Sequence, residues 1–220
     1  MSPDLKDIKT RRFDPVSKSK TFNNILREFG LRDKAVLDIG CSYGEFLAHF
    51  GPQSMGLTIS PEETKIAQEM GLQVILLNIE ETDLPKNFSG KFDVIFANNI
   101  FEHMQSPHNF LLKIKNYLQP NGSLILGVPT LPRPLWLTRF NKFRGSLASL
   151  HINFFTRDTV IKTTEFAGWQ VLGARGFYFS NKFIDMLFNK VYPHIYVYAK
   201  VDTEFKKSSK RLEELKGYKS

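Results

Sequence analysis

The chain has 220 residues, of which 42% are hydrophobic and 24% are charged, and its formal net charge is +8. This composition suits one good-sized core and excludes a disordered chain, and no apolar run approaches the roughly 18 residues of a membrane span. Lysines and arginines gather at 6–20, 133–144 and 206–219. Because such runs are usually solvated faces or tails, the charge only hints at an acidic partner.

The cysteine content bears on where the protein works. Cys41 is the one cysteine, so no internal disulfide can form, which is usual in a reducing compartment. The first residues, MSPDLKDIKTRRF, are too polar for the apolar core of a secretory signal. We therefore expect a cytoplasmic protein.

Strands and helices alternate after a polar start. Apolar residues at helical spacing predict a helix over 22–29, and Gly30 suits its C-terminal cap. A buried strand is predicted over 35–40, with the helix GEFLAHF (44–50) directly behind it. Further strands are predicted over 54–60, 73–79, 91–99 and 123–130, with helices that begin at Pro61 and near 109. Continuously apolar strands between amphipathic helices predict a parallel sheet that is covered on both faces.

The pattern changes after the fifth strand. The segment 131–151 is long, basic and aromatic, and we interpret it as a lid insertion. A helix over 156–168 and two closing strands complete the domain, which spans 21–202. A basic N-terminal extension (1–20) and a basic C-terminal tail (203–220) flank that domain.

The first strand ends in VLDIGCSYGEF, which places a carboxylate and two glycines at a strand-to-helix turn. Ligands bind at the carboxyl ends of strands in open α/β sheets. Gly40 permits a close backbone approach to such a ligand, and Gly44 would let the helix begin near it. A dinucleotide fingerprint would need glycine where Ser42 and Glu45 stand, and no P-loop ending is present. The turn therefore favours a nucleoside without phosphates, and Asp38 suits a cationic one.

This motif resembles the D-x-G-x-G-x-G signature of the class I S-adenosylmethionine-dependent methyltransferases, with Ser42 in place of the middle glycine. The resemblance implies a doubly wound, seven-stranded Rossmann-like sheet, mostly parallel with an antiparallel closing strand. It also implies S-adenosylmethionine as the cofactor. The residues of the turn that would contact this cofactor are Asp38, Gly40, Cys41, Ser42, Tyr43 and Gly44.

The second strand ends in GLTISPEET, where Thr58 stands at the place of the acidic residue that commonly clasps the ribose. This form resembles the cyclopropane-synthase-like enzymes, in which a side chain from the following helix helps to hold the ribose. The resemblance makes Glu63 the candidate for that contact. The alternative is that Glu63 is an ordinary first-turn carboxylate that favours the helix dipole.

Later segments continue the resemblance in the same order. LLNIEETDLP is similar to the family's D-x-E…LP, which implies that Asn78 accepts a hydrogen bond from the adenine and that Ile79 packs on its ring. FDVIFANNIFEHM resembles the fourth strand, whose main chain at Ala97 and Asn98 would face the methionine end of the cofactor. QPNGSLILGVPT is similar to the fifth strand. Glu102 and the histidine after it are interpreted as capping and packing residues.

Methyl transfer from a sulfonium is an in-line displacement, and a base is needed only when the acceptor keeps its proton. HINFFTRDTVIKTTEFAGW resembles the family segment at the mouth of the acceptor pocket, so His151 is the candidate base. The alternative is that His151 fastens its loop by hydrogen bonds. The histidines are scattered along the sequence and Cys41 lies in the cofactor turn, so we predict a metal-free enzyme.

The favoured function is O-methylation of a small-molecule, sugar or lipid-linked acceptor. One rival is a non-catalytic cofactor-binding scaffold, because Thr58 and Asn78 both weaken usual contacts. The other is an RNA-modifying enzyme. After the fourth strand, where an acceptor motif of the N-P-P-Y type would be expected, this sequence has NNIF instead, so a nucleic acid partner is disfavoured.

The lid insertion mixes Arg133, Arg139, Lys142 and Arg144 with leucines and aromatic residues. This mixture predicts either a lid over an acidic amphipathic acceptor or a segment that makes peripheral contact with a phospholipid membrane. The alternative is an ordinary lid, whose aromatic side chains fill the core and whose basic side chains are solvated.

Overall fold

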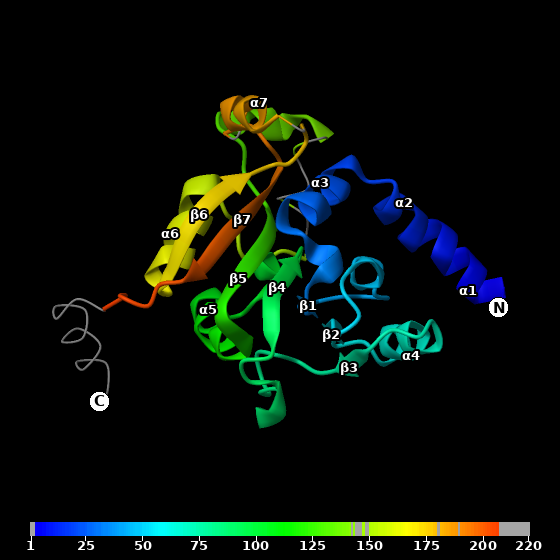
Figure 1. Cartoon of the computed structure of the whole chain (residues 1–220). Coiled ribbons are helices and arrows are strands. Elements are labelled where there is room, and N and C mark those ends of the chain that lie inside the picture. Colours follow the sequence, from blue (N-terminus) through cyan, green and yellow to red (C-terminus); the bar gives the residue numbers. More distant parts are fainter. Residues whose placement is uncertain are drawn as a thin grey trace.

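A computed structural model describes residues 3–141, 143, 147, 150–179, 181–188 and 190–206, and these form a sheet with helices on both faces (Figure 1). The sheet has seven strands in the order β3-β2-β1-β4-β5-β7-β6. They are β1 Val36–Ile39, β2 Met55–Thr58, β3 Val74–Leu76, β4 Phe92–Asn98, β5 Leu118–Pro129, β6 Trp169–Arg175 and β7 His194–Val201. Strand β7 is antiparallel to its neighbours β5 and β6, and the pairs among β1 to β5 are parallel. The predicted fold class is confirmed.

The α-helices are α1 Pro3–Ile8, α2 Asp14–Ser17, α3 Lys20–Phe29, α4 Pro61–Glu69, α5 Pro107–Ile114, α6 Arg157–Phe166 and α7 Lys182–Phe188. Helices α3 and α4 carry the terminal signals that were read from the sequence, Gly30 and Pro61. Helix α3 ends at Gly30, which adopts a left-handed φ of 60° as its C-cap. Helix α4 begins at Ser60, whose hydroxyl accepts a hydrogen bond from the Glu63 backbone N–H. Short turns of other helical type are η1 Lys9–Phe13, η2 Leu31–Asp33, η3 Leu47–His49, η4 Lys86–Phe88, η5 Phe101–His103, η6 Lys115–Tyr117 and η7 Leu135–Arg139.

Successive residues of the central strands pack on opposite faces of the sheet. In β4, Ile95 and Ala97 join the core that faces α5 and α6, whereas Val94 and Phe96 join the core that faces α3. Because both faces are covered, these strands are apolar throughout, which is why they read as continuous hydrophobic runs. Because β1 is parallel to both β2 and β4, the carboxyl ends of these three strands meet at one edge of the sheet.

The helix predicted over 44–50 does not form, and this prediction was wrong. The segment makes a turn followed by the short 3-10 helix η3. Gly44 has a φ of +87°, which a right-handed helix cannot accommodate. The chain then reverses at once, because the Gly51 backbone N–H donates to the Leu31 carbonyl. Apolar spacing alone did not reveal that the connection is too short for a helix.

The polar start is helical over its described part. Helix α1, the π-helix η1 and α2 form one helical arm that precedes α3 (Figure 1). Phe13 is buried, and Val16 of α2 packs against the core that contains Phe22 of α3. Within the described residues, no helix combines the length and the apolar character needed to cross a bilayer.

Candidate active site

The turn after β1 adopts left-handed backbone conformations at three positions. The φ angles are 77° at Gly40, 50° at Ser42 and 87° at Gly44. The φ at Gly40 favours glycine, and a Cβ added there would lie 3.1 Å from the Ile100 side chain, which would have to shift slightly. A Cβ at Gly44 would meet Leu72. Gly44 thus serves the turn and its packing. The prediction that Gly44 lets a helix begin near the ligand was wrong.

Asp38 lies at the end of β1 with 2% of its surface exposed. Its Oδ2 has no hydrogen-bond partner among the described residues. Burial, and then the nearby Glu45 carboxylate, raise the pKa of Asp38 well above its usual value. A buried carboxyl group without a partner is costly, so this site is suited to a cationic ligand that would restore its charge.

The ends of β1 and β2 share one polar network. Thr58 donates a hydrogen bond of 2.5 Å to Glu63 Oε2, and Ser42 donates one of 3.0 Å to Glu63 Oε1. The three residues come from the first turn, from the end of β2 and from the start of α4. The structure therefore brings together the two residues that the sequence assigned to the ribose.

Arg12 was missed by sequence reasoning. Its Nη2 lies 3.0 Å from Ser42 Oγ and 3.0 Å from Glu45 Oε1, and its guanidinium lies 5.6 Å from the centre of the Tyr43 ring. Burial raises the pKa of Glu45, and Arg12 opposes that rise. The helical arm thus closes over the candidate cofactor turn. The sequence showed only a basic run here, without an indication of where it packs.

The candidate adenine residues lie at the end of β3. Asn78 Oδ1 accepts from the Glu80 backbone N–H at 3.1 Å, and Asn78 Nδ2 donates to Glu81 at 2.8 Å. Ile79 is buried, with 4% of its surface exposed. A carbonyl oxygen has two lone pairs, so Asn78 retains capacity for a second donor. The adenine contacts stay predictions.

A cavity of about 310 Å³ opens at the carboxyl end of β4. Ala97 is fully buried there, and Asn98 Oδ1 is buried without a partner among the described residues. The cavity is lined by Pro15, Val16, Ser19, Thr21, Phe22, Phe46, Asn98, Asn99, Gly176, Tyr178, His194 and Tyr196. Aromatic walls with a few convergent polar groups are typical of a small-molecule site.

His194 was not singled out from the sequence, although it lines this cavity. Its Nε2 lies 2.8 Å from Asn99 Oδ1. Burial lowers the pKa of His194 to about 4. The imidazole is therefore neutral at physiological pH. The antiparallel pairing of β7 with β5 carries His194 to the carboxyl end of β4, and that pairing is not visible in local sequence patterns.

His151 lies in a cluster with Glu102 and His103. Glu102 Oε1 is 3.8 Å from His151 Nε2 and 3.9 Å from His103 Nε2. Glu102 is 1% exposed, and burial raises its pKa while His151 opposes the rise. His103 Nδ1 lies 3.0 Å from the Leu150 carbonyl oxygen. His151 is not among the described residues that line the cavity.

The three side chains of this cluster could hold a metal ion, because their ligand atoms all lie within 4.8 Å of one another. Two histidines that are scattered in sequence are thus neighbours in space. The expectation of a metal-free enzyme stays a prediction. Cys41 is buried, and burial raises the pKa of its thiol, so it has the character of an inert core residue.

Comparisons with known proteins place this geometry in a family. Residues 11–173 match a family described as a methyltransferase domain. The chain is 33% identical over 106 residues to the tRNA U34 carboxymethyltransferase of Cellvibrio japonicus. The aligned segment covers 44% of this chain and 33% of that protein. It is 30% identical over 114 residues to the mitochondrial ubiquinone biosynthesis O-methyltransferase of Schizosaccharomyces pombe. Here the aligned segment covers 46% of this chain and 39% of that protein. The chain thus spans well under half the length of these two relatives.

A solved structure supports the fold. The S-adenosylmethionine-dependent methyltransferase of Aquifex aeolicus superposes with a TM-score of 0.59 at 22% identity, covering 91% of this chain and 99% of that chain. The family match covers the first turn, strands β1 to β5 and part of the cavity lining, whereas Gly176, Tyr178, His194 and Tyr196 of that lining lie beyond it. This chain therefore belongs to the methyltransferase domain family.

Proposed function

We propose that this protein transfers the methyl group of S-adenosylmethionine to a hydroxyl group of a small-molecule, sugar or lipid-linked acceptor. The cavity at the carboxyl end of β4 carries the proposal, because it adjoins Asn98, where the methionine end of the cofactor is expected. Phe22, Phe46, Tyr178 and Tyr196 give it aromatic walls that suit a ring or an apolar chain. The ubiquinone biosynthesis relative, by its name, is an O-methyltransferase.

The residues of the turn fit the cofactor. Asp38 supplies a buried carboxyl oxygen without a described partner for its cationic end, and the Glu63 carboxylate suits the ribose hydroxyls. When bound, the cofactor supplies an activated methyl group for in-line displacement. The protein's own contribution is then to align the acceptor and to exclude water from the cavity.

His151 is the proposed base. Glu102 lies beside its Nε2 and would stabilise the imidazolium that forms when the acceptor hydroxyl loses its proton. His194 is less suited to that role, because a pKa of about 4 makes it a weak base at neutral pH. Its place in the cavity instead suits a hydrogen bond that orients the acceptor.

Two rival functions have their own supporting observations. An RNA acceptor is favoured by the tRNA-modifying relative and by the net charge of +8. A non-catalytic scaffold is favoured by Thr58 and Asn78, which replace usual contacts, but membership of a methyltransferase family favours the enzyme. The predicted cytoplasmic setting is kept as part of the proposal.

A labelled methyl-transfer screen tests these readings. The full chain is incubated with methyl-labelled S-adenosylmethionine and, in separate reactions, a lipid-linked phenol, a free phenol, a glycan and total tRNA. Label in a hydroxyl acceptor that declines strongly in His151→Gln, with cofactor affinity unchanged, supports the proposal. Label on tRNA alone would replace it by the RNA reading, and cofactor binding without transfer to any acceptor would favour the scaffold.

A further inference from the structure

Helix α7 is inverted, because it buries its acidic residue and exposes its apolar ones. Asp185 has no exposed surface, whereas Phe183 is 63% exposed and Leu187 is 64% exposed. Phe188, at the end of the helix, is also exposed. A helix that only covers a core would present the opposite pattern. The apolar face of α7 is therefore available to a partner.

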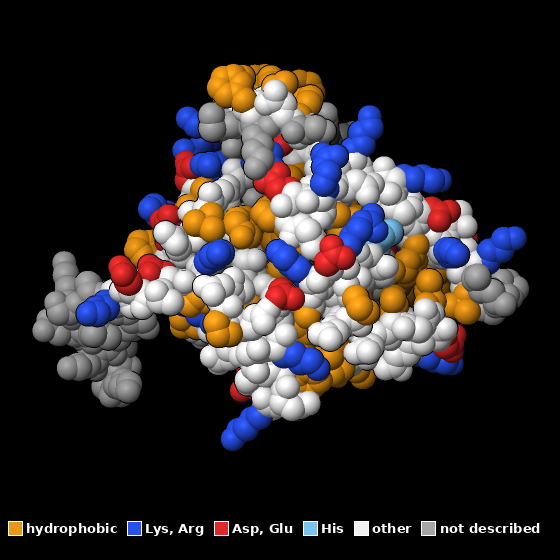
Figure 2. Space-filling view, in the orientation of Figure 1, with side chains coloured by type: hydrophobic (Ala, Val, Ile, Leu, Met, Phe, Trp, Pro, Cys, Tyr) orange, Lys and Arg blue, Asp and Glu red, His pale blue; other side chains and the backbone are white. Residues whose placement is uncertain are grey.

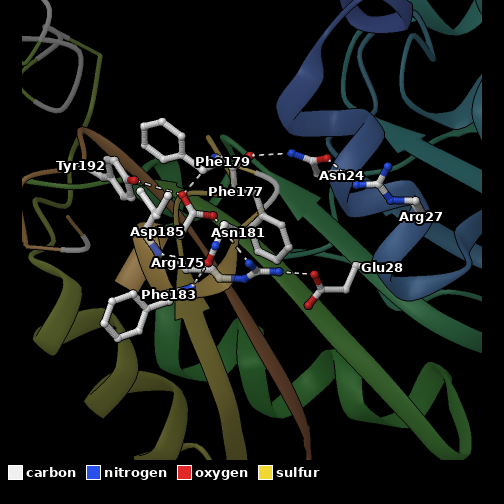
Figure 3. A network of polar contacts seen from close by, with 11 residues as sticks. Asn24, Arg27, Glu28, Arg175, Phe177, Phe179, Asn181, Phe183, Asp185 and Tyr192 are labelled. Atoms are coloured by element: carbon white, nitrogen blue, oxygen red, sulfur yellow. Dashed lines mark hydrogen bonds and ion pairs between the residues drawn. The ribbon is translucent and has the colours of Figure 1, made fainter. Parts of the chain in front are cut away.

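A polar network holds α7 in this orientation (Figure 3). Asp185 Oδ1 accepts from the Tyr192 hydroxyl at 3.0 Å and from the Phe179 backbone N–H at 3.1 Å. Asp185 Oδ2 lies 3.5 Å from Arg175 Nη1, and Arg175 also pairs with Glu28. The buried contacts of Asp185 thus fix the orientation of α7 and keep its apolar side chains on the outside.

A second segment extends the exposed apolar surface. The Arg133 backbone N–H donates to the Lys190 carbonyl at 2.7 Å, which joins the start of the basic aromatic segment to the residues after α7. In η7 and directly after it, Leu135, Trp136 and Phe140 are 56–59% exposed. The alternative that these side chains fill the core was therefore wrong for these three residues. Lys142 and Arg144 lie outside the described residues.

These two segments form one projecting surface, which we call the apolar cap. It comprises Leu135, Trp136, Phe140, Phe183, Leu187 and Phe188. Figure 1 shows α7 beside the neighbouring short helix at one end of the molecule, and Figure 2 shows hydrophobic side chains gathered there. Contiguous exposed apolar surface of this kind marks an interaction site.

The charge around the apolar cap selects the partner. In sequence, 131–154 and 176–193 carry six basic residues and a single acidic one, the buried Asp185. Of the six, Lys142 and Arg144 lie outside the described residues, and Arg133 pairs with Asp158 at 3.1 Å. Arg139 and Lys190 are exposed, and Figure 2 shows Lys and Arg side chains below the cap on both sides. Aromatic and leucine side chains flanked by cations match the interface of an anionic bilayer, in which the rings enter the headgroup boundary.

We propose that the apolar cap docks this protein onto anionic phospholipid membranes. Helix α7 has seven residues, too short to span a bilayer, so the contact is interfacial. The proposal goes beyond methyl transfer and is measured without it. If the acceptor is lipid-linked, docking would also bring the enzyme to the surface that holds its substrate.

Vesicle flotation of the full chain tests the docking. We expect binding to phosphatidylcholine vesicles that contain phosphatidylglycerol, weaker binding to pure phosphatidylcholine, and release at high salt. Phe183→Gln with Leu187→Gln should weaken the partition by about tenfold or more, because two apolar side chains that would enter the bilayer are lost. Trp136→Gln with Phe140→Gln, from the other segment, should act in the same direction.

Phe166→Gln is the matched control, since Phe166 is 67% exposed but lies on α6. It should bind vesicles like the unchanged protein, and unchanged cofactor affinity would show that every variant is folded. Wild-type binding by both cap variants would overturn the proposal. So would equal binding to neutral and anionic vesicles at all salt concentrations. A wild-type dimer that Phe183→Gln with Leu187→Gln converts to a monomer would assign the cap to self-association instead.

Discussion

The Thr58 hydroxyl donates a hydrogen bond of 2.5 Å to Glu63 Oε2 across the gap between β2 and α4. Ser42 donates to the other oxygen of the same carboxylate. Glu63 is therefore joined to the cofactor turn as well as to its own helix. Thr58 stands where the family usually has an acidic residue, and the Glu63 carboxylate reaches the same place from α4.

This relationship predicts unequal losses at the two residues. Glu63→Ala should weaken S-adenosylmethionine binding by about 1–3 kcal/mol, the range for a charge-assisted hydrogen bond. Thr58→Ala should cost less, because it removes only a neutral donor to Glu63. Glu62→Ala is the control, since Glu62 is exposed in the same first turn. Calorimetric titration checks the order, and equal or reversed losses would reject the assignment.

Gly40→Val should abolish cofactor binding. Its left-handed φ of 77° and the Ile100 side chain at 3.1 Å both oppose a branched Cβ, which would also narrow the ligand's approach. Gly71→Val is the control, because Gly71 has a φ of 83° with no atom within 4 Å of an added Cβ. Both variants should melt at lower temperature, and only Gly40→Val should lose affinity. Normal cofactor affinity in Gly40→Val would contradict this view of the turn.

Asp38 should make cofactor affinity depend on pH. Burial raises its pKa in the free protein, and a cationic ligand favours its ionised form. Binding therefore releases a proton, so the affinity should fall as the pH is lowered through the raised pKa. Asp38→Asn should raise Kd at neutral pH by roughly tenfold or more and remove this acid-side dependence. Calorimetry across a pH series measures both effects.

Asp38 should also affect the stability of the protein, and this effect depends on pH in the opposite direction to cofactor affinity. A carboxyl group whose pKa is raised on folding binds more protons in the folded state, so its contribution to stability declines as the pH rises above the unfolded value near 3.8. Asp38→Asn should therefore unfold at a higher temperature than the unchanged protein at neutral pH while binding the cofactor more weakly. A purely structural role for Asp38 would lower both quantities together.

His151→Gln should lower kcat by about a hundredfold or more if His151 is the base, which is the usual range for general-base catalysis. Cofactor affinity should not change, because His151 contacts Glu102 and is not one of the residues assigned to the cofactor. His103→Gln, in the same cluster, is the comparison and should cost less. An unchanged kcat would leave His151 with its structural role.

Chelation distinguishes a base from a metal ligand in this cluster. A metal-free enzyme should keep its full rate of methyl transfer after dialysis against a chelator. A rate that falls on chelation and returns with added zinc would instead identify Glu102, His103 and His151 as a metal centre, for which their ligand atoms are close enough. Metal analysis of the protein before and after dialysis provides the independent measurement.

The local sequence patterns determined the sheet and most of the cofactor turn. Continuous apolar strands require cover on both faces, and the cores on either side of β4 show this directly. The glycine at position 40 signalled a special backbone conformation, and its φ has that value. The resemblance of GLTISPEET to the cyclopropane-synthase-like enzymes indicated Glu63 as the partner of Thr58 at the ribose, and the two side chains are hydrogen-bonded in the structure.

Contacts between distant parts of the chain were decided only by the tertiary structure. Periodicity predicted a helix over 44–50, but the reversal at Gly51 leaves room for one short turn. Arg12 reaches Glu45, and Glu102 meets His151, through packing that no local spacing encodes. Helix α7 faces outward because Asp185 bonds to Tyr192 inside the protein. Hydrophobic patterns specify which residues prefer burial, whereas chain reversals and strand pairing specify which of them become neighbours.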